Sequence, residues 1–398
     1  MSYRNEKQTV WQRISLGETI LENQKSKIQV NKANGGSFVF FTSGDTILNY
    51  GYPIISGENL FLSTGGVANL KYFNGNCAYS TDTYSIRSKG SNRFLYYFLL
   101  SNLEYINENY FSGSGLKHLQ KSSLKSHIIS LPPIKEQQAI AEILTNLEDV
   151  ITKTKEIIKK QKLIKQGLMQ DLLTNGIDEK GNCRSLKTHK YEESELGLVP
   201  EEWEVENFTN RFVIQSGQVN PRIEPFSNMV LVAPDHIEQK TGILLGKVTA
   251  SEQGATSGKY LFHKGDVIYS KIRPYLRKAI LVDFDGICSA DMYPLKAKSN
   301  LNSYFLFLII LGEKFSIFAE QTSVRSGFPK INRSEMSEFK MAFPNLSEQT
   351  RIVEIIEAQD NQIQAEEKQL AKYEKIKKGL MNDLLTGKVR LPEFQIQN

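Results

Sequence analysis

The residues most suited to binding a polyanion form one short stretch, Tyr269-Ser270-Lys271-Ile272-Arg273-Pro274-Tyr275-Leu276-Arg277-Lys278, with four cations in eight residues. Lys and Arg neutralise phosphates, and Arg can also donate two hydrogen bonds to a guanine in the major groove. A solvated strand and turn is the alternative interpretation of the same pattern. The DNA-binding candidates in this stretch are Lys271, Arg273, Tyr275, Arg277 and Lys278.

A weaker pattern of the same kind lies between residues 59 and 72, where two expected strands flank a Gly-rich turn. Amide, ammonium and phenol groups can bond base edges or phosphates. The candidates here are Asn59, Asn69, Lys71 and Tyr72. Two Ser-Gly turns, at 114–115 and 326–327, add further cations that could reach a phosphate, namely Lys117, Arg325 and Lys330.

Catalytic motifs do not accompany these cations. An adenine methyltransferase needs a Gly-rich cofactor loop and an Asn/Asp-Pro-Pro-aromatic run, and Leu131-Pro132-Pro133-Ile134 supplies only the prolines. No phosphate-binding GxxxxGK[ST] loop is present. Asp235 and Glu238 are too close in sequence for a nuclease site on adjacent strands, and the three cysteines lack CxxC spacing. We therefore expect no catalytic residue, no metal site and no cofactor.

Charge is distributed unevenly along the chain. Residues 1–130 hold 13 Lys and Arg against 8 Asp and Glu, and residues 207–342 hold 17 against 12, whereas the net charge of the whole chain is only +5. Two basic globular stretches favour a polyanionic partner, although such an excess is also common on solvated surfaces. The chain contains no apolar run long enough for a membrane span and no apolar signal segment at its start, so we expect a cytoplasmic protein without a membrane partner.

A long internal repeat organises the rest of the sequence. Residues 132–174 align without a gap to residues 344–386, at an offset of 212, and 17 of the 43 positions are identical. The period is far too long for a solenoid. The sequence therefore predicts one module used twice.

Each copy of the repeat has the pattern of a long amphipathic helix. Proline stands at its start and not in its interior, and apolar residues recur at a spacing of three and four. Such a seam can be covered by one partner helix, and a duplicated unit closes most easily about a pseudo-two-fold axis. We expect the two helices to pack antiparallel as a coiled coil, with Ile140 near Leu380 and Leu168 near Ile352. Two separate helices, each docked on its own domain, are the alternative.

The globular stretches predict two similar α/β (α+β) domains with related loops. Expected strands include residues 11–17, 37–41, 52–55, 229–232 and 266–270, and residues 93–100 and 303–310 fit buried helices. Ser80-Thr81-Asp82 parallels Ser289-Ala290-Asp291. The expected organisation is a first recognition domain at 1–130, a first spacer helix at 131–176, a linker at 177–190, a second recognition domain at 191–342, a second spacer helix at 343–390 and a tail at 391–398.

This arrangement resembles the specificity (S) subunit of Type I restriction-modification systems over the whole chain. The resemblance is carried by the two helix starts at 131–141 and 343–353, the two helix ends Lys165–Leu173 and Lys377–Leu385, and the motif Leu198-Val199-Pro200-Glu201-Glu202-Trp203. It implies a subunit without catalytic activity whose two target recognition domains each read one half of a split site in double-stranded DNA. It also implies that the helices bind two methyltransferase subunits, that two motor/nuclease subunits complete the complex, and that the complex directs adenine methylation and restriction.

Recognition domains of this family diverge strongly, so the DNA-binding candidates above depend on residue chemistry alone. Three other interpretations remain open: a subunit of a methylation-only or Type IIB-like complex, a free-standing DNA enzyme, and a coiled-coil scaffold that reads no DNA. The free-standing enzyme conflicts with the missing motifs, and the scaffold explains only the helices.

Overall fold

A computed structural model describes residues 11–33, 35–323 and 328–395. It divides into two compact units, residues 1–157 with 366–398 (unit 1) and residues 158–365 (unit 2). Both boundaries fall inside the long helices α5 (Ile134–Leu172) and α9 (Leu346–Leu384), so each unit contains one globular part and a portion of each helix. In the described part of the chain, no helix is both long and apolar enough to cross a membrane.

The globular part of unit 1 is built on a four-stranded sheet with the order β2-β8-β5-β6. A smaller sheet has the order β4-β3-β7, with β3 and β7 parallel. The strands of the two sheets are β2 (Ile20–Glu22), β3 (Phe38–Phe41), β4 (Ile47–Tyr50), β5 (Glu58–Ser63), β6 (Leu70–Asn74), β7 (Cys77–Tyr79) and β8 (Thr83–Ser88). The other elements are β1 (Gln12–Ser15), α1 (Leu16–Thr19), η1 (Val30–Lys32), α2 (Asn92–Ser101), α3 (Leu103–Asn109), β9 (Phe111–Ser112), β10 (His118–Leu119), α4 (Lys121–Lys125) and β11 (Ile128–Leu131).

Unit 2 repeats this plan. Its main sheet has the order β15-β22-β19-β20, and its second sheet, β16-β18-β21-β17, again contains a parallel pair, β17 with β21. The strands are β15 (Phe212–Ile214), β16 (Gln218–Val219), β17 (Val230–Val232), β18 (Lys259–Phe262), β19 (Val267–Ser270), β20 (Ala279–Leu281), β21 (Gly286–Cys288) and β22 (Met292–Ala297). The remaining elements are β12 (Tyr191–Ser194), β13 (Gly197–Pro200), β14 (Glu204–Asn207), η2 (Phe208–Arg211), η3 (Phe226–Asn228), η4 (Pro234–His236), η5 (Pro274–Leu276), α6 (Ser303–Leu311), α7 (Glu313–Ser323), α8 (Arg333–Ser337) and β23 (Lys340–Phe343), and η6 (Pro392–Phe394) belongs to unit 1.

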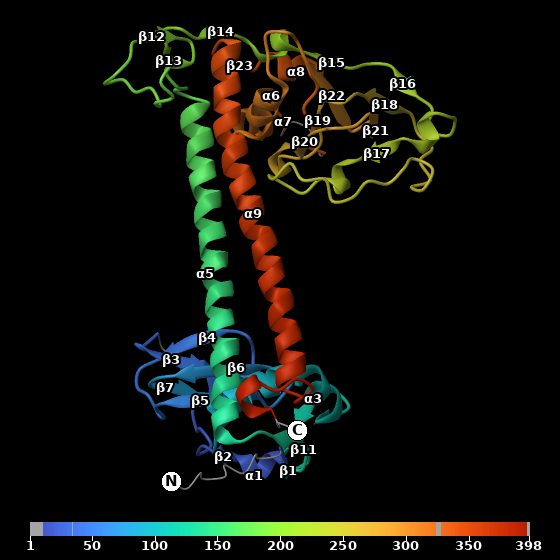
Figure 1. Ribbon diagram of the computed structural model, residues 1–398. Coiled ribbons are helices and arrows are strands. Elements are labelled where there is room, and N and C mark those ends of the chain that lie inside the picture. The colour runs from blue at the N-terminus through green and yellow to red at the C-terminus, as the bar shows by residue number, and fades with distance from the viewer. Residues whose placement is uncertain (1–10, 34, 324–327, 396–398) are drawn as a thin grey trace. The chain divides into compact units, whose positions relative to one another are not determined.

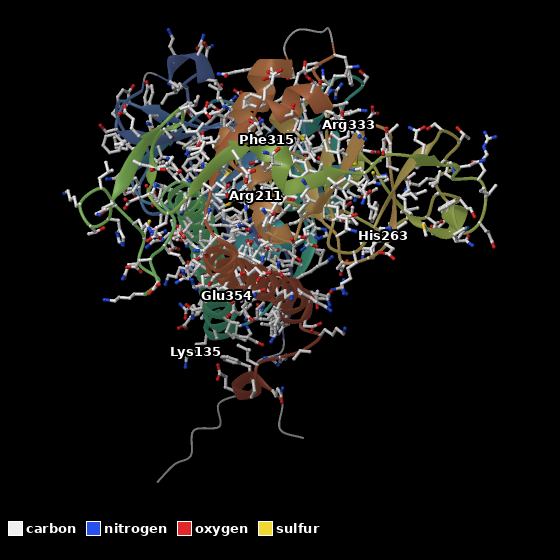
Figure 2. The ribbon with its side chains drawn as sticks, turned by 90° about the horizontal axis from the view of Figure 1, so that it is seen from above. Lys135, Arg211, His263, Phe315, Arg333 and Glu354 are labelled. Carbon is white, nitrogen blue, oxygen red and sulfur yellow. The ribbon has the colours of Figure 1, made fainter. Side chains whose placement is uncertain are left out.

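A buried apolar helix covers the main sheet in each unit. Ser91 caps the start of α2, because its side chain accepts a hydrogen bond from the backbone N–H of Phe94, and Asn302 caps α6 in the same manner. Such caps satisfy backbone N–H groups that a helix start leaves unpaired. In unit 2 the core also includes Phe315 of α7, whose ring lies 5.4 Å from that of Phe208; Figure 2 labels Phe315.

The long helices pack antiparallel, as the repeat predicted. Figure 1 shows α5 in green beside α9 in red, and both helices are 39 residues long with starts and ends related by the offset of 212. In unit 1 the buried Ile140 belongs to the same apolar cluster as Leu384, with Leu380 packed against it. In unit 2 Leu168 packs on the cluster that contains Ile352.

Ion pairs follow the same register. Glu148 pairs with Lys377 at 2.7 Å in unit 1, and Lys165 pairs with Asp360 at 2.5 Å in unit 2. The two pairs are therefore related by the repeat, because positions 165 and 377 differ by 212 residues.

Most strand predictions are confirmed, and two differ. Residues 52–55 form no strand, and only Ile55 makes an isolated bridge, with Cys77. The strand expected at 11–17 ends at Ser15, because Leu16 begins the short helix α1. Residues 52–54 are exposed, so their apolar pattern does not reflect a buried strand, and over 11–17 periodicity cannot distinguish a strand from a strand followed by a short helix.

Candidate nucleic-acid interface

Equivalent loops meet at one corner of each globular part. Corner 1 consists of the loop after β3 (residues 42–46), the turn after β7 (80–82) and the β5–β6 loop (64–69). Corner 2 consists of the loop after β17 (233–236), the turn after β21 (289–291) and the β19–β20 loop (271–278).

The same backbone contacts hold both corners together. Thr64 donates its N–H to the carbonyl oxygen of Asp82 at 3.1 Å, and Lys271 donates to that of Asp291 at 3.0 Å. The equivalent positions of Asp82 and Asp291 agree with the sequence similarity between Ser80-Thr81-Asp82 and Ser289-Ala290-Asp291.

A distant segment joins each corner at the same repeat position. Gly65 bridges to His118 in unit 1, and Ile272 bridges to Lys330 in unit 2. Positions 118 and 330 are again 212 residues apart. The structure thereby brings predicted residues from separate segments into one place, Lys117 beside the β5–β6 loop and Lys330 beside the β19–β20 loop.

In corner 2 the predicted cations fall into two groups. Arg273 and Lys330 are exposed, and Lys271 is partly buried with its ammonium group 5.2 Å from the ring centre of Tyr293. Lys278 and Arg277 instead make internal bonds: Lys278 donates to the carbonyl oxygen of Pro234 at 2.6 Å, and Arg277 donates to the hydroxyl of Ser316 at 2.7 Å.

The backbone of this loop is unusual. Arg273 and Arg277 flank η5 with φ of 46° each, in the left-handed region that side chains other than glycine seldom occupy. The loop therefore does not present its cations along one strand. Arg273 faces Phe328, with its guanidinium carbon 5.6 Å from the ring centre, and Tyr275 is 45% exposed. Arg325 lies outside the described residues.

In corner 1 the predicted polar residues mainly brace the loop. The ammonium group of Lys71 donates to the carbonyl oxygen of Thr42 at 3.1 Å and also to that of Gly44, and partial burial lowers the pKa of Lys71. The amide of Asn69 donates to the carboxylate of Asp45. Lys117 is exposed.

Asn59 and Tyr72 lie away from this loop. Asn59 is fully buried, and its amide donates to the carbonyl oxygens of Ser56 and Gly57. This placement counts against Asn59 as a DNA contact: the polar residue was expected at a strand surface, but it closes a turn inside the domain. The guanidinium carbon of Arg93 lies 3.9 Å from the ring centre of Tyr72, and burial raises the pKa of Tyr72 to about 12.

Two groups of residues that sequence reasoning did not identify stand out. A cavity of about 620 Å³ in unit 1 is lined by Lys27, Lys32, Tyr50 and Tyr52, and the two tyrosine rings lie 4.9 Å apart. Aromatic rings beside lysines are typical of nucleic-acid-binding surfaces. Only the short spacing between the two tyrosines was visible in the sequence.

The second group anchors the long helices. Glu136, fully buried at the start of α5, accepts hydrogen bonds from Arg390 and from the indole of Trp11. At the repeat-related position in unit 2, Glu348 accepts from Arg184 and Trp203. The identity of Glu136-Gln137 with Glu348-Gln349 was the only sequence signal for this group.

The neighbouring glutamines tie each long helix to its globular part. Gln137 accepts the N–H of Ser91 at 3.1 Å, and Gln349 accepts the N–H of Asn302 at 2.8 Å. Because Ser91 and Asn302 cap α2 and α6, each glutamine fixes a globular part to the start of a long helix.

Chemical sites of other kinds are not found in the described residues. No group of three or more His, Cys, Asp or Glu side chains is placed there to hold a metal ion. Burial raises the pKa of the Cys77 thiol to about 12 and also raises that of Cys288, so neither thiol is poised as a nucleophile.

Comparison with known proteins agrees with the two-fold plan. Residues 10–163 and 228–375 match the Type I restriction modification DNA specificity domain. The specificity subunit of the Type I restriction enzyme EcoDI from Escherichia coli is 31% identical over 363 residues, which are 87% of this chain and 80% of that subunit.

Two solved structures share the fold. The S subunit of a Type I restriction-modification system from M. genitalium superposes with a TM-score of 0.62 at 14% identity, covering 96% of this chain and 98% of that one. A chain from a structural study of complex assembly and conformational transition in a Type I system gives 0.55 at 14% identity, covering 98% and 100%. The chain described here belongs to the family of Type I restriction-modification specificity subunits.

Proposed function

We propose that this chain is the non-catalytic DNA-recognition subunit of a Type I restriction-modification complex, and that its two globular domains each read one half of a bipartite site in double-stranded DNA. The domains are those of residues 1–130 and 191–342. In this assignment the chain holds no catalytic residue and no cofactor, and adenine methylation and cleavage belong to its partner subunits.

The observation that carries the proposal is the repetition of a corner that is held by the same backbone contacts but carries different side chains. Both corners lie on main sheets of the same strand order and use the same loop contacts, with Gly65–His118 and Ile272–Lys330 at related positions. Their exposed groups differ, since corner 1 presents Lys117 and corner 2 presents Arg273 with Lys330. A shared frame with different side chains is suited to reading two different base sequences.

The repeated helices support two copies of one partner. Ile134 is 46% exposed and its repeat equivalent Leu346 is 44% exposed, while Ile164 is 43% and its equivalent Ile376 is 40% exposed. Apolar side chains exposed at equivalent places suggest two equivalent contacts, which we assign to two methyltransferase subunits. Two motor/nuclease subunits would join through this complex.

Methylation mapping tests the proposal. The chain would be expressed in cells that lack other adenine methyltransferases, with and without its methyltransferase partner, and N6-methyladenine would be mapped across the genome. We expect a bipartite methylated motif only when both proteins are present. Turnover of S-adenosylmethionine by the purified chain alone would contradict the non-catalytic assignment.

Adding the motor/nuclease subunit decides between the related assignments. Protection of methylated DNA and cleavage of unmethylated DNA distinguish a full restriction system from a methylation-only complex, and cleavage at a fixed distance on both sides of the site indicates a Type IIB-like complex. A coiled-coil scaffold would give neither methylated motif nor specific DNA binding.

A further inference from the structure

Corner 2 contains a hollow whose chemistry differs from that of a simple phosphate-binding surface. The cavity, of about 420 Å³, is lined by residues of η4, of the β19–β20 loop and of the turn after β21. Arg273 and Lys278 contribute cations, of which Arg273 is exposed, and Asp235 and Asp291 contribute two exposed carboxylates.

The presence of carboxylates at a DNA-binding surface requires a specific explanation. Ionised Asp repels phosphates and can only accept hydrogen bonds. The Asp235 side chain is 84% exposed, and the ring nitrogen Nε2 of His236 lies 3.9 Å from it, which is longer than a hydrogen bond. Water satisfies this carboxylate in the free protein, and where DNA displaces that water an N–H donor of the DNA can replace it as the hydrogen-bond partner.

In corner 1 the carboxylate of the corresponding loop, that of Asp45, has a hydrogen-bond donor within the protein. The backbone N–H of Ser63 donates to the carbonyl oxygen of Asn69 at 3.0 Å, and that of Ser270 donates to the carbonyl oxygen of Lys278 at 2.9 Å, so Asn69 and Lys278 occupy equivalent places beside their strands. The Asn69 amide N–H donates to Asp45, in the loop after β3. Lys278 instead donates to the backbone oxygen of Pro234, and the carboxylate of Asp235 remains directed to solvent.

The bases differ in what they offer a carboxylate. In the major groove cytosine presents only the N4 amine, whereas adenine presents its N6 amine next to the N7 acceptor, which repels a carboxylate. Guanine presents two acceptors, O6 and N7, which suit an arginine. A carboxylate and an arginine on one cavity therefore match the two bases of a C·G pair.

We propose that the cavity of corner 2 reads a C·G base pair, with Asp235 or Asp291 accepting from the cytosine amine and Arg273 donating to the guanine. This assignment rests on the proposed function, because it requires the domain of residues 191–342 to read DNA. It adds the identity of one base pair in the half-site of that domain.

The test uses the complete complex with its methyltransferase. Asp235→Asn and Asp291→Asn each replace an acceptor-only group by an amide of the same shape that also donates. Asp283→Asn is the matched control, since Asp283 is 81% exposed in the same domain and does not line the cavity. Genome-wide N6-methyladenine mapping gives the motif for each variant, and binding competition between oligonucleotides measures discrimination at each position.

The expected result is a wild-type motif that contains a C·G pair in one half, and a loss of discrimination of about tenfold or more at that pair in at least one of the two cavity variants. The control should keep the wild-type motif. An unchanged motif in both cavity variants would overturn the inference, as would relaxation at an A·T pair. Failure of the proposed function has a different signature, because the wild-type complex would then produce no bipartite motif at all.

Discussion

The guanidinium of Arg390 donates two hydrogen bonds to the buried carboxylate of Glu136, from Nε at 3.0 Å and from a terminal nitrogen at 2.7 Å. This bond connects the segment after α9 to the start of α5, 254 residues earlier in the chain. The Glu136 carboxylate also raises the pKa of Arg390, so the cation is the stable form of the partner. The bond thus ties the segment after α9 to the start of α5 within unit 1, and the pair of Glu348 with Arg184 is its repeat-related counterpart in unit 2.

Replacing Glu136 by Ala should lower the free energy of unfolding by about 3–5 kcal/mol, because the change leaves the cation of Arg390 without its partner. Denaturant unfolding of the full chain measures this loss. Glu142→Ala, on an exposed face of α5, is the control and should have little effect. Equal stability of the two variants would show that the buried pair does not anchor the helix.

Gly176→Ala should be destabilising for reasons of space as well as backbone conformation. Gly176 has φ of +64°, and an added Cβ would lie 2.1 Å from Oε1 of Glu348 and 2.5 Å from the ring of Trp203. Gly181 has φ of +82° with nothing within 4 Å, so Gly181→Ala isolates the backbone cost. We expect the unfolding midpoint of Gly176→Ala to be clearly lower than that of Gly181→Ala, and similar midpoints would count against close packing around Glu348.

Substitutions of Lys71 and Lys117 should distinguish a lysine that stabilises a loop from a lysine that contacts a DNA phosphate. Lys71→Met removes the bonds to the carbonyl oxygens of residues 42 and 44, so it should lower stability. Lys117→Met should leave stability unchanged and reduce the salt dependence of DNA binding by roughly one unit of slope. Unfolding curves and binding at several salt concentrations distinguish the two, and a reversed pattern would reject both roles.

Arg273→Ala should weaken specific DNA binding by about 1–3 kcal/mol at one base pair, since its exposed guanidinium is placed for base or phosphate contact. Arg222→Ala, also exposed in the same unit, controls for the loss of one positive charge. Competition binding with the complete complex provides the measurement. Parallel losses in both variants, uniform over all sequences, would indicate a phosphate contact without base reading.

The sequence predicted the long helices because their signal is local and extended. Proline at the start, a spacing of three and four over about 40 residues and the gapless repeat all pointed to the same elements, and they placed Ile140 near Leu380. The pairing of Glu136 with Arg390 was not predictable, because the partners are far apart in the chain and no local pattern links them.

The candidate interface was predicted less well than the fold. The cations of residues 271–278 do gather at a corner with Lys330. Because the backbone is left-handed at Arg273 and Arg277, their side chains do not follow one strand as the sequence suggested. Arg277 bonds to Ser316 inside the domain. Asn59 is a polar residue of a type that can contact DNA, but its side chain is buried. Residue type indicates what a side chain can bond, whereas loop conformation decides whether that bond is made inside the protein or with DNA.

The central claim, that each domain reads its own half-site, is tested most directly by exchanging residues 1–130 for the first domain of another family member and mapping N6-methyladenine produced by the complete complex. Joining at residue 130 keeps the start of α5 with Glu136 and Gln137. We predict that one half of the methylated motif takes the donor's sequence while the other half remains unchanged. A motif that changes in both halves, or in neither, would contradict the account.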